Sequence, residues 1–287
     1  MKIITDLQEM YKHSICLKKT HKISFIPTMG ALHNGHLSLI EKAYYNNKNS
    51  KIIVSIFANP SQFTNFEDFA KYPDTIDSDI KKLKEFEISK NIQIDCVFIP
   101  EKNNDFYSNK KYPQLQKFNI NKSEIILPQF FSESEGKTRK GHFEGVFQVL
   151  FRLFYIISPD YSVFGQKDFQ QTLLVQYLQK QYFPHLEIII ADICREKSGL
   201  AMSSRNKRLS AENKNKAKIL YQALQTKKIE TIRTILESEK LIEKIHYIEI
   251  RNTTTFELMD KKVMNEVSVI LLSVQFAGIH LIDNILI

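Results

Sequence analysis

Two histidines stand three residues apart in the segment FIPTMGALHNGH, which spans residues 25–36. An apolar, strand-like run ends at Pro27, a turn containing Gly30 follows, and a helix is expected to begin near His36. Because His33 and His36 meet at that helix start, both imidazoles can donate hydrogen bonds to one anion. Backbone N–H groups and the positive end of the helix dipole favour phosphate at the same place. The segment therefore predicts a phosphate-binding turn.

Other kinds of site compete with this interpretation. The turn lacks the G-x-G-x-x-G and G-x-x-x-x-G-K-[ST] spacings, which argues against a dinucleotide site and a P-loop. A His-x-x-His pair also lacks the i,i+4 spacing and the adjacent acid of zinc-binding helices, so we assign no metal ligand. Taken alone, the two histidines are more typical of helix capping or of a surface.

A second polar window, SIFANPSQF, spans residues 55–63. The Asn59-Pro60 pair stops a strand and places Asn59 and Gln62 just beyond its carboxyl end, where parallel sheets bind small ligands. A glutamine side chain offers both a donor and an acceptor, which suits a hydroxy acid. Asn59 and Gln62 are therefore candidate substrate ligands, although a polar loop is the more ordinary interpretation of either residue alone.

A third window, FGQKDFQQ, spans residues 164–171. Lys167 follows Gly165 at another expected strand end and could reach phosphates as a point charge. Asp168 stands at an expected helix N-cap. Gln171 lies in the first turn of that helix and is expected to face the same cleft.

The fourth window, REKSGLAMSSRN, spans residues 195–206. Its Ser203, Ser204 and Arg205 supply two hydroxyl donors and a bidentate cation, which suits a polyphosphate. The segment 135–145 also holds three of the chain's 8 glycines, which indicates a tight loop or a close backbone approach.

The elements that must position these windows alternate between strand and helix. Expected strands cover 22–27, 51–57, 94–99, 161–164 and 187–193; expected helices cover 36–47, 74–86, 145–157 and 168–182. This alternation predicts an α/β domain with a parallel sheet over residues 1–193. Residues 101–140 are expected to form a loop-rich excursion, as a lid or a partner contact.

The pattern changes after residue 193. Two charged helical stretches, 210–226 and 229–240, precede three strand-like runs at 246–251, 267–276 and 280–287. No helix is expected between the last two runs, so residues 194–287 predict a smaller α+β domain.

Composition narrows the class of protein. The 287 residues include 40 Lys+Arg and 32 Asp+Glu, a net charge of +8, but the lysines are scattered among acids and arginine is scarce. That pattern does not favour nucleic-acid binding. No apolar run is long enough to span a membrane, and the 3 cysteines, Cys16, Cys96 and Cys194, form no C-x-x-C pair. We expect a cytoplasmic protein with reduced thiols and no membrane partner.

Taken together, the motifs resemble those of the pantothenate synthetase family, ATP-dependent ligases that join pantoate to β-alanine. PTMGALHNGH, SIFANPSQF, GHFEGV, FGQKDFQQ, REKSGLAMSSRN and the closing LIDN occur in the family's order, and the resemblance covers essentially the whole chain. It implies a Rossmann-like amino-terminal domain that binds ATP and pantoate, a smaller carboxy-terminal lid domain and a homodimer. It also implies Mg²⁺ and two steps: formation of pantoyl adenylate with release of pyrophosphate, then attack by β-alanine with release of AMP.

The resemblance implies a role for each matching residue. ATP would be bound by four segments, which are Met29, Gly30, Ala31, Leu32, His33, Asn34, Gly35 and His36; Gly165, Gln166, Lys167 and Asp168; Cys194; and Met202, Ser203, Ser204 and Arg205. His36 would donate a proton to the departing phosphates, with His33 as its neighbour and Lys167 on phosphate. Gln62 and Gln171 would hold pantoate, and Gln62 would also lie near β-alanine.

Three positions depart from the family pattern. Gln166 replaces a usual Glu, Lys140 replaces a Pro, and Asp74 replaces an Arg. We expect the change at Gln166 to affect nucleotide affinity more than reaction type. The His-x-Gly-His motif alone is shared with class I aminoacyl-tRNA synthetases and nucleotidyltransferases. The alternative is a nucleotidyltransferase whose product keeps the nucleotide.

Overall fold

The computed structural model describes residues 1–287 except 64–68, 70–74, 101–105, 108–112 and 261–266, so Asp74 lies outside the described residues. The chain divides into two compact units. Unit 1 comprises Met1–Pro128, Arg139–Gly165 and Gln171–Ala191, and unit 2 comprises Gln129–Thr138, Gln166–Gln170 and Asp192–Ile287. Unit 2 thus includes two short segments that precede residue 192 in the sequence.

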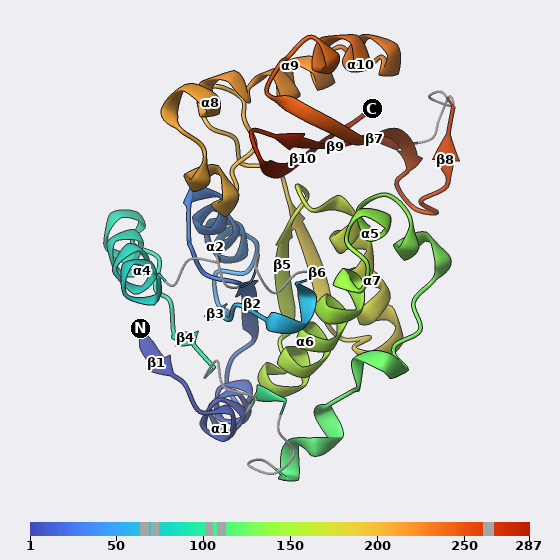
Figure 1. The fold of residues 1–287 in the computed structure, drawn as a ribbon. Coiled ribbons are helices and arrows are strands. Elements are labelled where there is room, and N and C mark those ends of the chain that lie inside the picture. Colours follow the sequence, from blue (N-terminus) through green and yellow to red (C-terminus); the bar gives the residue numbers. More distant parts are fainter. Residues whose placement is uncertain (64–68, 70–74, 101–105, 108–112, 261–266) are drawn as a thin grey trace. The chain divides into compact units, whose positions relative to one another are not determined.

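Unit 1 contains a parallel sheet of six strands (Figure 1). The strands are β1 (Lys2–Ile4), β2 (Ile23–Thr28), β3 (Lys51–Ile56), β4 (Cys96–Phe98), β5 (Tyr161–Gly165) and β6 (Glu187–Ala191), in the order β1-β4-β3-β2-β5-β6. In the sheet centre, Phe25 of β2 pairs with Ile53 of β3 and Ser162 of β5. The predicted α/β class and the parallel pairing of the first two predicted strands are confirmed.

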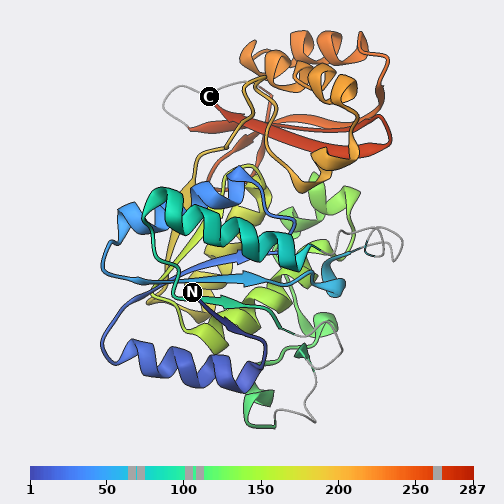
Figure 2. The same cartoon turned by 90° about the vertical axis from the view of Figure 1, so that its left-hand side faces the viewer.

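Helices cover both faces of this sheet, as Figure 2 shows for α4 and α1. The helices of unit 1 are α1 (Leu7–Lys18), α2 (Asn34–Asn46), α4 (Ile76–Lys90), α6 (His142–Ile157) and α7 (Phe169–Tyr182). On one face, Ile40 of α2 and Leu83 of α4 share a core with Val54 of β3. On the other face, the Phe25 and Phe154 rings meet edge to face with centroids 6.3 Å apart. Burial on both faces explains the continuous apolar runs of the strands.

The amino-terminal elements β1 and α1 were not among the predicted ones. Asp6 caps α1 by accepting a hydrogen bond from the Glu9 N–H at 2.8 Å. Leu7 and Met10 bury one side of the helix. A capping Asp followed by apolar residues at helical spacing is a start signal that the sequence does carry. The predicted loop-rich stretch holds, in its described parts, only the short helices η3 (Pro113–Phe118), η4 (Lys122–Glu124), η5 (Gln129–Ser132) and α5 (Glu135–Thr138).

Unit 2 contains an antiparallel sheet in the order β10-β9-β7-β8. Its strands are β7 (Ile242–Asn252), β8 (Leu258–Met259), β9 (Ser268–Phe276) and β10 (Ile279–Leu286), and its helices are α8 (Ala211–Lys216), α9 (Ile219–Gln225) and α10 (Ile229–Glu237). Ala277 and Gly278 join β9 to β10 with φ of 46° and 73°, as a two-residue hairpin turn requires. The predicted helix over 210–226 is interrupted between α8 and α9, and β10 follows β9 without an intervening helix, as expected.

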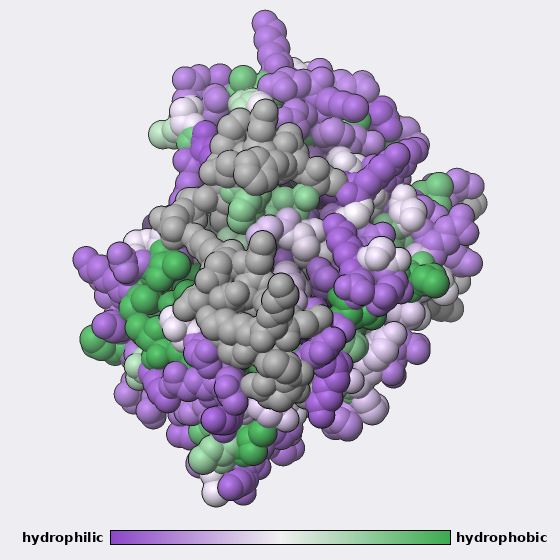
Figure 3. Space-filling model, turned by 60° about the horizontal axis from the view of Figure 1, so that its bottom comes forward, coloured by the Kyte–Doolittle hydropathy of each residue, from purple (hydrophilic) through white to green (hydrophobic). Residues whose placement is uncertain are grey.

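The hydropathy of the helices and of the surface bears on whether the chain could enter a membrane. Among the described residues, no helix combines the length and apolar character needed to cross a bilayer. On the face drawn in Figure 3, hydrophilic residues predominate and hydrophobic ones form separate patches.

All three cysteines are free thiols, with Cys16 exposed and Cys96 buried. Burial raises the pKa of the Cys96 thiol to about 12, so this group stays protonated.

Candidate active site

The side chain of Asp79, on another helix, accepts hydrogen bonds from the turn between β2 and α2. Gly30 and Ala31 adopt positive φ values of 84° and 51°. The N–H groups of Ala31 and Leu32 donate to the Asp79 carboxylate at 2.7 and 2.8 Å. Asp79 lies on α4 and is fully buried. Sequence reasoning did not single out this residue, because it looks like one more acid in a charged helix.

His33 and His36 cap the start of α2 with their own rings. The Gly35 N–H donates to His33 Nδ1 at 3.1 Å, and the His33 N–H donates to His36 Nδ1 at 3.3 Å. The ring centroids lie 4.1 Å apart. A ring nitrogen that accepts a hydrogen bond carries no proton, so the neutral form of each imidazole bears its proton on Nε2. The predicted pairing of the two histidines at the helix start is therefore observed, and the bonds that each Nδ1 accepts assign the proton of the neutral ring to Nε2.

Five backbone N–H groups at this turn form hydrogen bonds within the protein. Besides the N–H groups of Ala31, Leu32, His33 and Gly35, that of Gly30 donates to Thr28 Oγ1 at 3.2 Å. Each of these five groups has a partner within the protein. The expected contact between backbone N–H groups of this turn and a phosphate stays a prediction.

Asn59 caps the short helix η1 (Pro60–Gln62) and is 1% exposed. Its Nδ2 donates to Gln62 Oε1 at 3.2 Å and to the Gly145 carbonyl at 3.0 Å. Its Oδ1 accepts from the Tyr107 hydroxyl at 3.0 Å and from the Ser61 N–H and hydroxyl. The amide is fully engaged by protein groups. This geometry orients Gln62, and the expectation that Asn59 binds substrate directly stays a prediction.

Gln62 and Met29, two of the predicted site residues, are in contact. Gln62 Nε2 donates to Met29 Sδ, while its backbone carbonyl accepts from His142 Nδ1 at 2.9 Å. The first turn of α6 lies against the same backbone at Gly145. A Cβ added at Gly145 would stand 2.6 Å from Gln62 Cα and closer still to the Ser61 carbonyl oxygen. Only glycine permits this approach, as the glycine-rich window predicted.

Gly165 and Gln171 complete the predicted residues of unit 1. Gly165 ends β5, and a Cβ there would lie 3.8 Å from Leu39 of α2. Gln171 lies half-buried in the first turn of α7, which follows the same strand. Because β2 and β5 pair in parallel, their carboxyl ends face the same edge of the sheet.

In unit 2, the backbone around Lys167 is held by Asn284, from the LIDN segment. Asn284 Nδ2 donates to the carbonyls of Gln166 and Lys167 at 3.1 and 3.0 Å. Its Oδ1 accepts from Gln166 Nε2 at 3.0 Å. Lys167 Nζ lies 3.5 Å from the Asp168 carboxylate. The predicted residues did not include Asn284, although LIDN is one of the motifs that carry the resemblance.

A buried ion pair stands next to this contact. Arg195 donates to both carboxylate oxygens of Asp283, at 2.6 and 2.9 Å, and its guanidinium lies 3.9 Å from the centroid of the Tyr221 ring. Burial raises the pKa of the Asp283 carboxyl, and the hydrogen bonds from Arg195 oppose that rise. The pair therefore relies on Arg195 to keep a buried carboxylate ionised.

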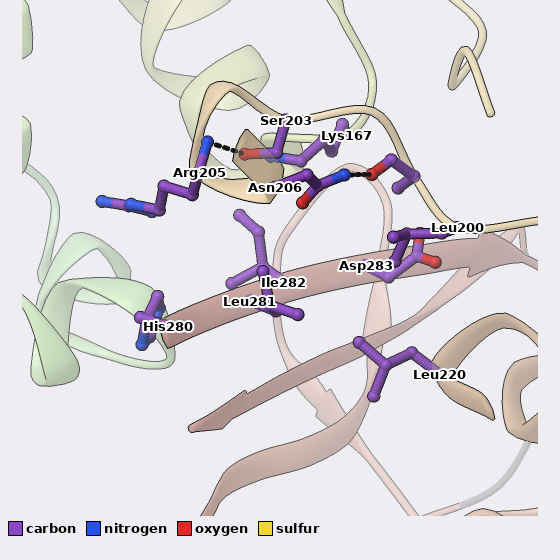
Figure 4. A pocket seen from close by; sticks show the side chains of 11 residues that line it. Lys167, Leu200, Ser203, Arg205, Asn206, Leu220, His280, Leu281, Ile282 and Asp283 are labelled. Carbon is purple, nitrogen blue, oxygen red and sulfur yellow. Dashed lines mark hydrogen bonds between the residues drawn. The ribbon is translucent and has the colours of Figure 1, made fainter. Parts of the chain in front are cut away.

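The remaining predicted residues line or flank a small pocket of unit 2 (Figure 4). Lys167, Ser203 and Arg205 face residues 280–283 of β10 across this pocket. Ser203 caps η6 (Ser204–Arg208) through its Oγ, which accepts from the Arg205 N–H at 3.3 Å. The Met202 N–H donates to the Cys194 carbonyl at 3.0 Å, so these two residues lie together. Lys167 and Arg205 give the pocket its positive charge.

Two of the three residues that depart from the family pattern, Gln166 and Lys140, lie in different parts of the structure. Gln166 is one of the residues that bind Asn284, and Lys140 is exposed immediately before Gly141, whose φ is 75°. Metal ligands were not predicted, and among the described residues no group of three His, Cys, Asp or Glu side chains could hold a metal ion.

The parallel sheet, with the histidine-capped helix after β2, belongs to the α/β class of proteins that bind ligands beyond the carboxyl ends of their strands. A family model described as pantoate-beta-alanine ligase matches residues 2–286. The chain belongs to this family of ligases. The predicted family and enzyme class are confirmed.

Individual relatives agree over nearly their full lengths. The chain is 38% identical to the pantothenate synthetases of Cytophaga hutchinsonii and Caldicellulosiruptor bescii, and it covers 98% and 99% of these two proteins. The pantothenate synthetase structure from Thermus thermophilus is 29% identical with a TM-score of 0.84, each chain covering 99% of the other. The Francisella tularensis ligase, solved with beta-gamma ATP and β-alanine, is 32% identical with a TM-score of 0.76, covering 100% of this chain and 97% of its own.

Proposed function

We propose that this chain condenses pantoate with β-alanine in an ATP-dependent reaction, through a pantoyl adenylate intermediate. The observation that carries the proposal is the family match over residues 2–286, which includes all the predicted site windows. The related Francisella ligase with beta-gamma ATP and β-alanine bound supports the choice of substrates.

In the first step, a pantoate carboxylate oxygen attacks the α-phosphorus of ATP, and the bond to pyrophosphate breaks. The protein's task is to position the reactants and to stabilise charge on the phosphates. We assign this stabilisation to His33, His36 and Lys167. A neutral ring whose Nδ1 accepts a hydrogen bond cannot release its Nε2 proton without becoming an anion. His36 therefore acts as a hydrogen-bond donor to the departing phosphates and does not transfer its proton.

In the second step, the free amine of β-alanine attacks the acyl carbon, AMP departs, and a proton passes to solvent. Gln62 and Gln171 are proposed to orient the pantoyl group. Because Gln62 Oε1 accepts from Asn59 and one Nε2–H donates to Met29 Sδ, Gln62 offers its second Nε2–H donor to the substrate oxygens. This choice of donor suits the hydroxyl and carbonyl oxygens of a pantoyl group.

Four further features belong to the proposal. Residues 1–193 form the ATP- and pantoate-binding catalytic domain, and residues 194–287 form its lid. The other proposed ATP ligands are the remaining residues of the four sequence segments: Met29, Gly30, Ala31, Leu32, Asn34 and Gly35; Gly165, Gln166 and Asp168; Cys194; and Met202, Ser203, Ser204 and Arg205. Mg²⁺ enters with ATP, held mainly by phosphate oxygens and water, and we assign it no protein ligand. The enzyme is a cytoplasmic homodimer.

The exchange of labelled pyrophosphate into ATP tests the reaction. Exchange should require pantoate, and addition of β-alanine should yield AMP and pantothenate in equal amounts. Exchange that proceeds without pantoate, or that fails in its presence, contradicts the proposal. A product that retains the nucleotide would instead identify the alternative nucleotidyltransferase.

A further inference from the structure

The turn Gly30–Leu32 has the backbone form that binds anions in other proteins. Two successive residues, Gly30 and Ala31, have positive φ, and the N–H groups of Ala31 and Leu32 point at one acceptor. Such concave backbone segments bind phosphates and other anions. Here the anion is a carboxylate of the protein itself. Asp79 Oδ2 accepts from Ala31, and Asp79 Oδ1 accepts from Leu32.

Two further side chains at the start of α4 reinforce this contact. The Thr75 hydroxyl accepts from the Ala31 N–H at 3.0 Å and donates to Asp79 Oδ2 at 2.9 Å. Lys82 Nζ donates to the Leu32 carbonyl at 2.5 Å. Asp79 is fully buried, so water does not compete for its oxygens. Three donors compensate for the burial of the carboxylate, which would otherwise be costly.

The same turn determines where α2 begins. Leu32 directly precedes His33, the N-cap residue, and the capping bonds of both histidines follow within the next four residues. Ala31 has a side chain that disfavours positive φ, so the turn needs an outside partner to keep this shape. Asp79 supplies that partner across 47 residues of sequence.

We propose that Asp79 is a positioning residue for adenylation. Its carboxylate fills the anion-binding turn, fixes the start of α2 and so holds the His33 and His36 rings in the capping arrangement that places their protons on Nε2. This role rests on the proposed function. Because the N–H groups of Ala31 and Leu32 serve Asp79, the proposed phosphate contacts of His33 and His36 come from their side chains.

The substitution Asp79→Asn tests the proposal, with Asp77→Asn as the matched control. Asn keeps the shape of Asp but presents an NH₂ group to one of the two backbone N–H donors. Asp77 lies on the same helix, is exposed, and undergoes the same chemical change. We expect D79N to lower kcat/KM for ATP in pantoate-dependent pyrophosphate exchange by about 10- to 100-fold, the effect of losing a hydrogen bond to a charged group. D77N should retain the wild-type value.

A second measurement separates positioning from a general loss of stability. In ¹⁵N NMR spectra of the free protein, His33 and His36 should each show a proton on Nε2 and none on Nδ1. D79N should shift both rings toward a mixture of the two neutral forms, while D77N should not. If D79N fails to fold, Thr75→Ala should produce the same shifts to a smaller extent.

Two outcomes overturn the proposal. One is a D79N enzyme with the exchange kinetics of D77N. The other is a D79N enzyme that is less stable and less active but whose histidine signals match those of the wild type, which makes Asp79 a structural residue only. Absence of exchange in the wild type rejects the proposed function instead, and the histidine spectra still decide the role of Asp79.

Discussion

Asn59 Nδ2 lies 3.2 Å from Gln62 Oε1, and this contact decides which end of the Gln62 amide is available to a ligand. Rotation of the Gln62 amide would break this hydrogen bond. The backbone of Gln62 is fixed separately, because its carbonyl accepts a hydrogen bond from His142. In the proposed reaction, Asn59 would therefore act on the substrate through Gln62. This arrangement explains why two polar residues three positions apart have unequal roles.

Replacement of Asn59 by Ala should raise the KM for pantoate about 10-fold or more, because Gln62 loses its orienting bond and the Gly145 carbonyl loses a donor. The KM for ATP should change less. Steady-state kinetics with each substrate varied in turn provide the measurement. Tyr107→Phe removes only one of the bonds to Asn59 Oδ1 and should show a weaker effect in the same direction. Equal increases in both KM values for N59A would argue against an orienting role.

Gly145→Ala should destabilise the protein by about 1–3 kcal/mol, the usual cost of overpacking, and should also raise the KM for pantoate. The added methyl group would push the backbone of Ser61 and Gln62 away from α6. Thermal unfolding and pantoate kinetics test the two effects. Gly165→Ala is the stability control, since its Cβ makes an ordinary contact at 3.8 Å. A G145A protein as stable as the wild type would show that α6 can shift without consequence.

His36→Asn should lower adenylation by about 10²–10³-fold, the loss typical of one preorganised donor, while leaving the unfolding temperature near that of the wild type. An Asn Oδ1 can replace the ring Nδ1 as acceptor of the His33 N–H, but the Nε2–H is lost. Lys167→Ala should reduce adenylation to a similar extent. Pyrophosphate exchange measures both variants, with the exposed His185→Ala as control. Near-normal exchange in H36N and K167A would remove their proposed roles.

Arg195→Met should cost about 3–5 kcal/mol of stability at neutral pH, because the buried Asp283 carboxylate loses its partner. Burial raises the pKa of Asp283 and Arg195 opposes that rise, so without Arg195 the folded protein favours the protonated carboxyl and the penalty grows as pH rises above the usual carboxyl range. Denaturant unfolding of R195M at several pH values should show the deficit shrinking toward acid pH. Addition of Asp283→Asn should recover much of the loss, and a pH-independent deficit would contradict this account.

Periodicity and turn residues were sufficient to predict the parallel sheet, most of its helices and the last two strands. The same local signals placed His33, Gln62 and Lys167 just beyond strand or helix boundaries. The long-range partners of the site could not be predicted. From the sequence, Asp79 is indistinguishable from the exposed acidic residues of α4. Nothing in the sequence near Asn284 indicates that the Asn284 side chain binds the backbone of Lys167. Gly145 was recognised as a close approach, but its partner, Ser61, is 84 residues earlier. Such pairings depend on how the elements pack.

The accessibility of the thiols affects how a homodimer should be assayed. Cys96 is buried and stays protonated, whereas Cys16 is exposed on α1 and can form an intermolecular disulfide when a purified sample oxidises. A covalent dimer joined through Cys16 would have the same mass as the proposed non-covalent one. Light scattering in the presence of a reducing agent, or on a Cys16→Ser protein, distinguishes assembly from oxidative cross-linking.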